Sequence, residues 1–116
     1  MFSVFNSQIW LHKKPVDFRM QINGLMMMVA DLLKMEPTSG QLYVFRNKQA
    51  DKLKILYWQN NGFWLFYRRL EKGRMQFPEI SEETTQISQE QLGWLLSGIE
   101  IKQKVSVKAV IGTEFF

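Results

Sequence analysis

The fold is decided by residues 41–78, which read QLYVFRNKQADKLKILYWQNNGFWLFYRRLEKGRMQFP. Runs of β-forming residues alternate there with turn residues, a pattern typical of antiparallel strands. We expect strands at residues 42–45, 53–58, 63–70 and 74–77. In the turn at residues 59–62, Asn61 and Gly62 are expected to supply the two positive φ angles of a tight hairpin. The stretch therefore predicts an antiparallel meander.

The two long strands of this meander have apolar side chains on both faces. Leu53, Ile55 and Tyr57 share one face of the second strand, and Leu56 and Trp58 fall on the other. Two interpretations follow. Either both sides of the sheet are partly covered, or one side presents arginine and aromatic side chains to a ligand.

Two helices flank the meander. The first is expected to start at Asn23 and to stop at residues 36–40, with the apolar face Leu25, Met28, Val29, Leu32 and Leu33. The second opens at Ser88, which forms a capping box with Gln91, and Gly98 is expected to cap its end. Its predicted apolar face is Leu92, Leu95, Leu96 and Ile99, with Trp94 beside it.

The remaining segments complete the predicted fold. Residues 8–12 form a short strand that ends before Pro15, and residues 80–86 read as a polar, acidic loop. We therefore predict a single α+β domain at residues 1–101, an antiparallel β-meander of about four to five strands packed against two helices. Residues 102–116 are a C-terminal extension, either an edge strand or a loose tail.

Composition limits the classes of protein to consider. Of the 116 residues, 46% are hydrophobic and 22% charged, which is ordinary for a soluble globular domain. The chain has no cysteine, so disulfides, cysteine zinc sites and thiol nucleophiles are excluded. The longest apolar run, residues 25–30, is too short to span a membrane, and no signal peptide follows Met1. We expect a cytoplasmic protein.

Charge is concentrated in two blocks. Residues 46–74 carry eight basic and two acidic side chains, a local charge of +6 against +4 for the whole chain. Residues 75–100 carry five glutamates and no lysine or arginine. The acidic block either neutralises the basic block internally or forms a separate surface for a protein partner.

The basic block points to a polyanion as partner, in particular a nucleic acid. The alternative is that these cations only keep a sheet face soluble and block aggregation. Trp58, Trp64 and Tyr67 are expected mainly in the core, and would stack on bases if exposed. The interpretation requires the cations to converge into one exposed positive field. The predicted phosphate contacts are Arg46, Lys48, Lys52, Lys54, Arg68, Arg69, Lys72 and Arg74.

Catalytic patterns are missing from the sequence. His12 is the one histidine, and Asp17, Asp31 and Asp51 are spread over three segments. We find no nucleophile motif, phosphate loop or dinucleotide fingerprint. The sequence therefore predicts a non-enzymatic protein without metal or cofactor, and a carboxylate-dependent nuclease remains a weaker alternative.

Several segments of the chain form an ordered set. They are Asp17-Phe18-Arg19, Asn23-Gly24-Leu25, residues 39–47 (SGQLYVFRN), 54–58 (KILYW), 62–65 (GFWL), 68–74 (RRLEKGR), 77–78 (FP) and 92–99 (LGWLLSGI). In their order and spacing these segments resemble a known family, the TnpB-like or Orf2-like accessory proteins of the sixty-six-type bacterial insertion sequences. The resemblance covers about residues 9–99, and the family usually has Asp where this chain has Gln59.

The resemblance implies a non-catalytic accessory protein that assists transposition alongside a separate transposase. Combined with the basic block, it favours a protein that binds DNA, in particular the ends of its element. The alternative is an adaptor that docks the transposase through the acidic C-terminal third and does not bind DNA.

Overall fold

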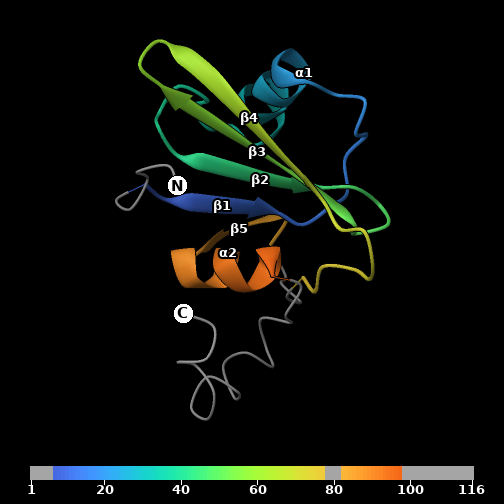
Figure 1. The fold of residues 1–116 in the computed structure, drawn as a ribbon. Coiled ribbons are helices and arrows are strands. Elements are labelled where there is room, and N and C mark those ends of the chain that lie inside the picture. Colours follow the sequence, from blue (N-terminus) through green and yellow to red (C-terminus); the bar gives the residue numbers. More distant parts are fainter. Residues whose placement is uncertain (1–6, 78–81, 98–116) are drawn as a thin grey trace.

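The structure of the protein is a computed structural model that describes residues 7–77 and 82–97. Its centre is a five-stranded sheet with the strand order β4-β3-β2-β1-β5 (Figure 1). The strands are β1 (Ile9–His12), β2 (Leu42–Arg46), β3 (Lys52–Gln59), β4 (Gly62–Arg69) and β5 (Thr84–Ile87). The helices are α1 (Ile22–Met27), the π-helix η1 (Met28–Leu32) and α2 (Gln89–Leu96). The α+β class predicted from the sequence is confirmed.

Strands β2, β3 and β4 form the expected antiparallel meander. Gln59 pairs with Gly62 at the end of the β3–β4 hairpin, so the two turn residues are Asn60 and Asn61. Their φ angles are 49° and 65°, which is the left-handed region that a primed turn requires. The prediction placed the positive φ angles at Asn61 and Gly62, one residue too late, because Gly62 already belongs to the ladder.

The other two strands differ from the predicted meander. Strand β1 runs parallel to β2, and residues 13–41, which contain α1, form the crossover that a parallel pair needs. On its other side β1 pairs antiparallel with β5, where we expected a polar loop. Only Ile87 of the four β5 residues is buried, so no hydrophobic alternation marks the strand. The two threonines of β5 favour an extended backbone, and hydrogen bonding to β1 makes this segment a strand.

The predicted strand at residues 74–77 does not form, and the segment has an irregular conformation. After Gly73, whose φ is 77°, the chain turns toward the β2–β3 loop and does not run back along β4. The amide of Met75 donates to the carbonyl oxygen of Ala50 at 2.7 Å, and the Met75 side chain is buried in the core. Burial of the Met75 side chain and this backbone bond hold the segment in place, without strand pairing.

Both faces of the sheet are covered. On one face, Leu92 and Leu95 of α2 pack against a cluster that includes Leu42, Val44 and Ile55. On the opposite face, Leu25 of α1 and Val29 of η1 pack against Tyr43, Phe45 and Leu56. Figure 1 shows the two helical layers on opposite sides of the sheet. The mixed apolar faces of the central strands therefore reflect burial on both sides.

The first helix begins one residue earlier than predicted and changes to π geometry in its second half. The amide of Leu33 donates to the carbonyl of Met28 at 3.1 Å, five residues back. A wider turn rotates the following side chains, so Val29 is fully buried while Leu32 is 60% exposed. Leu32 was predicted on the apolar face and is not there. Lys34, with a φ of 56°, ends the helical segment.

Helix α2 confirms its predicted start. The Ser88 hydroxyl accepts from the amide of Gln91, and the Gln91 side-chain oxygen accepts from the amide of Ser88, which is a complete capping box. Leu92, Trp94 and Leu95 are buried. The predicted cap Gly98, Ile99 and the extension at residues 102–116 lie outside the described residues. No helix within residues 7–77 and 82–97 has the length and apolarity needed to cross a membrane.

His12 at the end of β1 gives the fold a pH dependence. Its side chain is buried, and its Nδ1 lies 3.2 Å from the Thr84 hydroxyl of β5. Burial lowers the pKa of His12 below 6.5; Glu83 opposes this shift, while Lys14 and Arg46 reinforce it. Because the unfolded chain then binds a proton more readily, stability is full above pH 6.5 and falls as the pH drops through 6.5 toward the folded pKa.

We expect urea unfolding to give a lower free energy at pH 5.5 than at pH 7.5. The contribution of one histidine to this difference is at most about 1.4 kcal/mol. His12→Gln keeps a polar partner for Thr84 but cannot take up the proton, so its free energy of unfolding should change less between the two pH values. An unchanged pH dependence in His12→Gln would rule out His12 as the cause.

Candidate nucleic-acid interface

Six of the eight predicted cations belong to neighbouring segments at one end of the sheet. Strand pairing sets Lys52, at the start of β3, opposite Arg69, at the end of β4. Backbone bonds from Leu70 to Asp51 and from Met75 to Ala50, both 2.7 Å, join the loop after β4 to the β2–β3 loop. We call this cationic surface the basic end; it comprises Lys48, Lys52, Arg68, Arg69, Lys72 and Arg74.

Asn47 fixes the β2–β3 loop of the basic end. Its buried side-chain oxygen accepts hydrogen bonds from the amides of Asp51 (3.1 Å) and Lys52 (3.0 Å). Its amide nitrogen donates to the Asp51 carboxylate at 2.6 Å, which holds the pKa of Asp51 below its usual value. An asparagine side chain thus replaces backbone partners in a tight loop, so the loop cations project from an ordered segment.

The eight cations do not converge on one face of the sheet. Lys52, Lys54 and Arg69 lie on the α1 side, whereas Arg46 and Arg68 lie on the α2 side. The Arg46 Nε donates to the carbonyl of Lys13 at 2.8 Å, and its guanidinium lies 5.1 Å from the Phe77 ring centroid. Burial lowers the pKa of Arg46. The expected single field is therefore replaced by a basic end that reaches both sides.

Arg68 and Arg69 leave β4 on opposite sides. The Arg68 Nε donates at 2.9 Å to the carbonyl of Leu96, at the end of α2. Arg69 forms an exposed ion pair with Glu71 at 3.0 Å, and hydrogen bonding to this carboxylate raises the pKa of Arg69. Exposed pairs of this kind contribute little stability, so Arg69 can exchange Glu71 for a phosphate at small cost.

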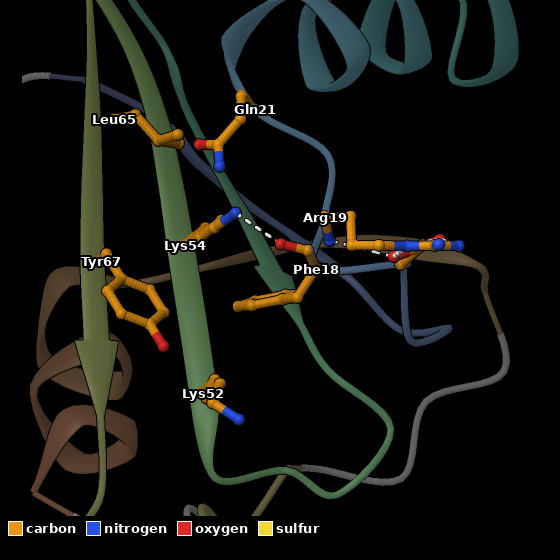
Figure 2. Close-up of a pocket in the computed structure, with 8 residues that line it drawn as sticks. Phe18, Arg19, Gln21, Lys52, Lys54, Leu65 and Tyr67 are labelled. Atoms are coloured by element: carbon orange, nitrogen blue, oxygen red, sulfur yellow. Dashed lines mark hydrogen bonds and ion pairs between the residues drawn. The ribbon is translucent and has the colours of Figure 1, made fainter.

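Lys54 is buried and has structural partners. Its Nζ donates to the carbonyls of Phe18 (2.9 Å) and Met20 (2.7 Å), and the bond to Phe18 is drawn in Figure 2. The ammonium also lies 4.9 Å from the Phe18 ring centroid and 5.9 Å from that of Tyr67. Burial lowers the pKa of Lys54, and the charge of Asp17 partly opposes this. Lys54 thus ties the segment before α1 to the sheet.

That segment and the β3–β4 ribbon enclose an open groove of about 610 Å³ (Figure 2). Phe18, Arg19 and Gln21 come from the chain before α1, and the other wall comes from the ribbon. The groove adjoins the basic end because Lys52 belongs to both. Its lining residues are Asp17, Phe18, Arg19, Gln21, Lys52, Lys54, Leu65 and Tyr67.

Asp17 is the one acid that lines the groove, and Arg19 neutralises it. The Arg19 Nη2 lies 2.6 Å from Oδ2 of Asp17, and the Arg19 amide donates to Oδ1 at 2.9 Å. These bonds lower the pKa of Asp17 to about 2, so the carboxylate stays ionised at neutral pH. With Lys52 and Lys54 added, the groove has a net positive charge.

Two aromatic side chains of β4 are exposed, contrary to the expectation that they lie in the core. Trp64 is 53% exposed on the α2 side, where its ring stacks on Phe66 at 5.9 Å. Tyr67 is 54% exposed on the α1 side, where it lines the groove. Trp58 is half-buried, with its ring 4.9 Å from that of Phe63.

Charge counting missed the wall of the groove before α1. Phe18, Arg19 and Gln21 lie more than twenty residues before the basic block in the sequence. The fold places them beside the β3–β4 ribbon, where Lys54 bonds to the carbonyls of Phe18 and Met20. A signal was present in Asp17-Phe18-Arg19, a matching segment of the family resemblance, but only the fold assigns it to this site. Within the described ranges, no three His, Cys, Asp or Glu side chains are grouped so as to hold a metal ion.

Comparison with known proteins identifies the family. A family model described as "IS66 Orf2 like protein" matches residues 7–106. The chain belongs to the IS66 Orf2-like family. Two relatives from Sinorhizobium fredii (strain NBRC 101917 / NGR234) carry the descriptions "Uncharacterized protein y4jC" and "Uncharacterized protein y4hO".

The similarity to these relatives extends over most of each chain. The protein y4jC is 34% identical over 93 residues, which cover 80% of this chain and 80% of y4jC. The protein y4hO is 35% identical over 95 residues, or 82% of this chain and 83% of y4hO. No solved structure shows a significant match. Family membership indicates an accessory protein of insertion-sequence transposition.

Proposed function

We propose that this Orf2-like protein is a non-catalytic accessory factor that binds DNA through its basic end and assists a separate transposase. The observation that carries the proposal is the backbone pairing that brings six cations from the β3–β4 ribbon and its loops together. Two acids accompany them, and each is engaged: Asp51 by Asn47 and Glu71 by Arg69. A cationic surface of this kind binds phosphates and releases counterions.

The predicted contacts divide by exposure and by whether the side chain is bonded to a backbone carbonyl. Lys48, Arg69, Lys72 and Arg74 are exposed and Lys52 is half-exposed, so these side chains can reach phosphates. Arg46 and Lys54 are less exposed and bond to backbone carbonyls, and Arg68 is exposed but also donates to a backbone carbonyl, so these three act first as parts of the fold. We therefore propose the first group as the main phosphate contacts.

The combined variant Lys52→Gln, Arg69→Gln, Arg74→Gln tests the proposal. Salt-titrated binding to element-end and random DNA should show weaker binding at every salt concentration. On duplex DNA, the slope of log K against log salt should become shallower by about 2 to 3, because each lost phosphate contact removes roughly 0.9. Equal loss on both sequences is expected, since phosphate contacts carry no sequence information.

A charge-matched pair of single variants serves as the control. Lys34→Gln removes an exposed lysine after η1, away from the basic end, and Lys52→Gln removes a half-exposed lysine within it. Only Lys52→Gln should make the slope of log K against log salt shallower. Circular dichroism should show that both variants are folded. A folded triple variant with the wild-type affinity and slope would contradict the proposal.

The adaptor alternative has less support from the described residues. Of the acids in residues 75–100, Glu83 forms an ion pair with Lys14 at 3.6 Å, and Glu79 and Glu100 lie outside the described residues. Copurification with transposase from nuclease-treated extract, together with no binding to any DNA, would favour the adaptor.

A further inference from the structure

Tyr67 occupies a special position in the groove beside the basic end. Tyr67 is 54% exposed on the α1 side of β4, whereas Lys54, its partner on β3, is buried. Figure 2 shows the Tyr67 ring on the ribbon wall, across from Phe18 on the opposite wall. The two ring centroids are 6.4 Å apart with an angle of 51° between the planes, so Phe18 supports one side of the tyrosine. Much of the Tyr67 ring remains open to the groove.

The charged groups near the Tyr67 ring are mainly cations, and the one carboxylate among the described residues that line the groove, Asp17, is paired with Arg19. Lys54 lies against the ring, and its two bonds to carbonyls use two of the three ammonium N–H groups. Lys52 lines the same groove. The groove thus combines an exposed aromatic platform, apolar surface from Leu65 and Phe18, and the cations Lys52 and Lys54 on the ribbon wall.

We propose that the groove binds single-stranded DNA, with one base stacked on Tyr67 and the adjoining phosphates beside Lys52 and its strand partner Arg69. This inference rests on the proposed DNA binding and makes it specific. In a duplex the base faces are covered by neighbouring pairs, so duplex DNA can offer only phosphates and base edges to this surface. An aromatic platform inside a cationic groove matches the requirements of an unpaired strand.

The test compares Tyr67→Ala with Trp64→Ala. Both remove an aromatic ring from β4 that is about half exposed, but Trp64 lies on the opposite side of the sheet from the groove. The full chain is titrated at fixed salt with a 20-nucleotide oligothymidine, a 20-base-pair duplex, and an abasic strand of the same length. Fluorescence anisotropy of the labelled DNA gives each affinity, and Tyr67→Phe serves as the conservative variant.

We expect oligothymidine to bind more tightly than the abasic strand, and Tyr67→Ala to weaken oligothymidine binding by roughly 5- to 100-fold. Tyr67→Ala should leave abasic and duplex binding within about two-fold, because their phosphate contacts are unchanged. Tyr67→Phe should restore tight binding, and Trp64→Ala should match the wild type.

Three results would overturn the inference. They are equal affinity for oligothymidine and the abasic strand, equal losses in Tyr67→Ala and Trp64→Ala, and binding of duplex only. The last result leaves the proposed DNA binding intact, whereas a wild-type protein that binds none of the three DNAs overturns both proposals.

Discussion

Phe45→Ala is expected to lower the free energy of unfolding by about 3–5 kcal/mol. Phe45 is fully buried in β2, in the cluster that joins the sheet to Leu25 and Val29. Truncation removes most of its apolar contacts and leaves a cavity that the flanking strands β1 and β3 are too constrained to close. The midpoint of thermal unfolding should fall by more than roughly 10 °C.

Chemical denaturation followed by tryptophan fluorescence measures this loss. The matched control is Trp64→Ala, which removes a larger ring that is half exposed and packs mainly on Phe66; its cost should stay below about 1.5 kcal/mol. A Phe45→Ala variant as stable as Trp64→Ala would mean that the α1 side of the sheet is not a packed layer.

Lys54→Ala is expected to lower the free energy of unfolding by about 2–4 kcal/mol. The substitution removes a buried aliphatic stem and leaves the carbonyls of Phe18 and Met20 without their donor. Residues 17–21 should then separate from the ribbon, so amide hydrogen exchange should rise there. The groove loses one wall, and binding of oligothymidine should weaken with it.

Lys52→Ala provides the comparison for Lys54. Lys52 lies on the same strand and side, two residues earlier, and is half-exposed. Its substitution should change stability by less than about 0.5 kcal/mol while weakening DNA binding. If Lys54→Ala instead kept full stability and only weakened DNA binding, Lys54 would be a phosphate contact, as the sequence alone suggests.

Local signals in the sequence predicted local structure well. The β3–β4 hairpin follows from two β-forming runs separated by Asn and Gly residues, and the α2 start follows from Ser88 and Gln91. Each depends on residues a few positions apart, whose preferences act before the rest of the chain is in place. The same locality explains the one-residue error in the turn, where either pair of small residues satisfies the pattern.

Structure that depends on distant partners was not predictable in this way. Strand β5 is polar in sequence and exists because β1, about seventy residues earlier, offers an edge. The π-helical turn of η1 also escaped detection, because a helical pattern assumes a constant 3.6 residues per turn.

For the candidate site, the sequence indicated that many cations lie close together in the chain. It did not indicate which side of the sheet each of them would occupy. Arg68 and Arg69 are adjacent, and the pleat of β4 places them on opposite sides of the sheet. Lys52 and Lys54 share a side, yet one is half-exposed and the other is buried. Burial and backbone partners decide which cation is free, and both arise from tertiary contacts.

The position of β1 also constrains the order of folding. This N-terminal strand lies between β2 and β5, so its second neighbour leaves the ribosome only after residue 87 has been made. The β2–β3–β4 ribbon can pair much earlier, since its strands are consecutive. Synthesis should therefore produce the ribbon first and complete the sheet only once β5 is available, with β1 held in the meantime on one side alone.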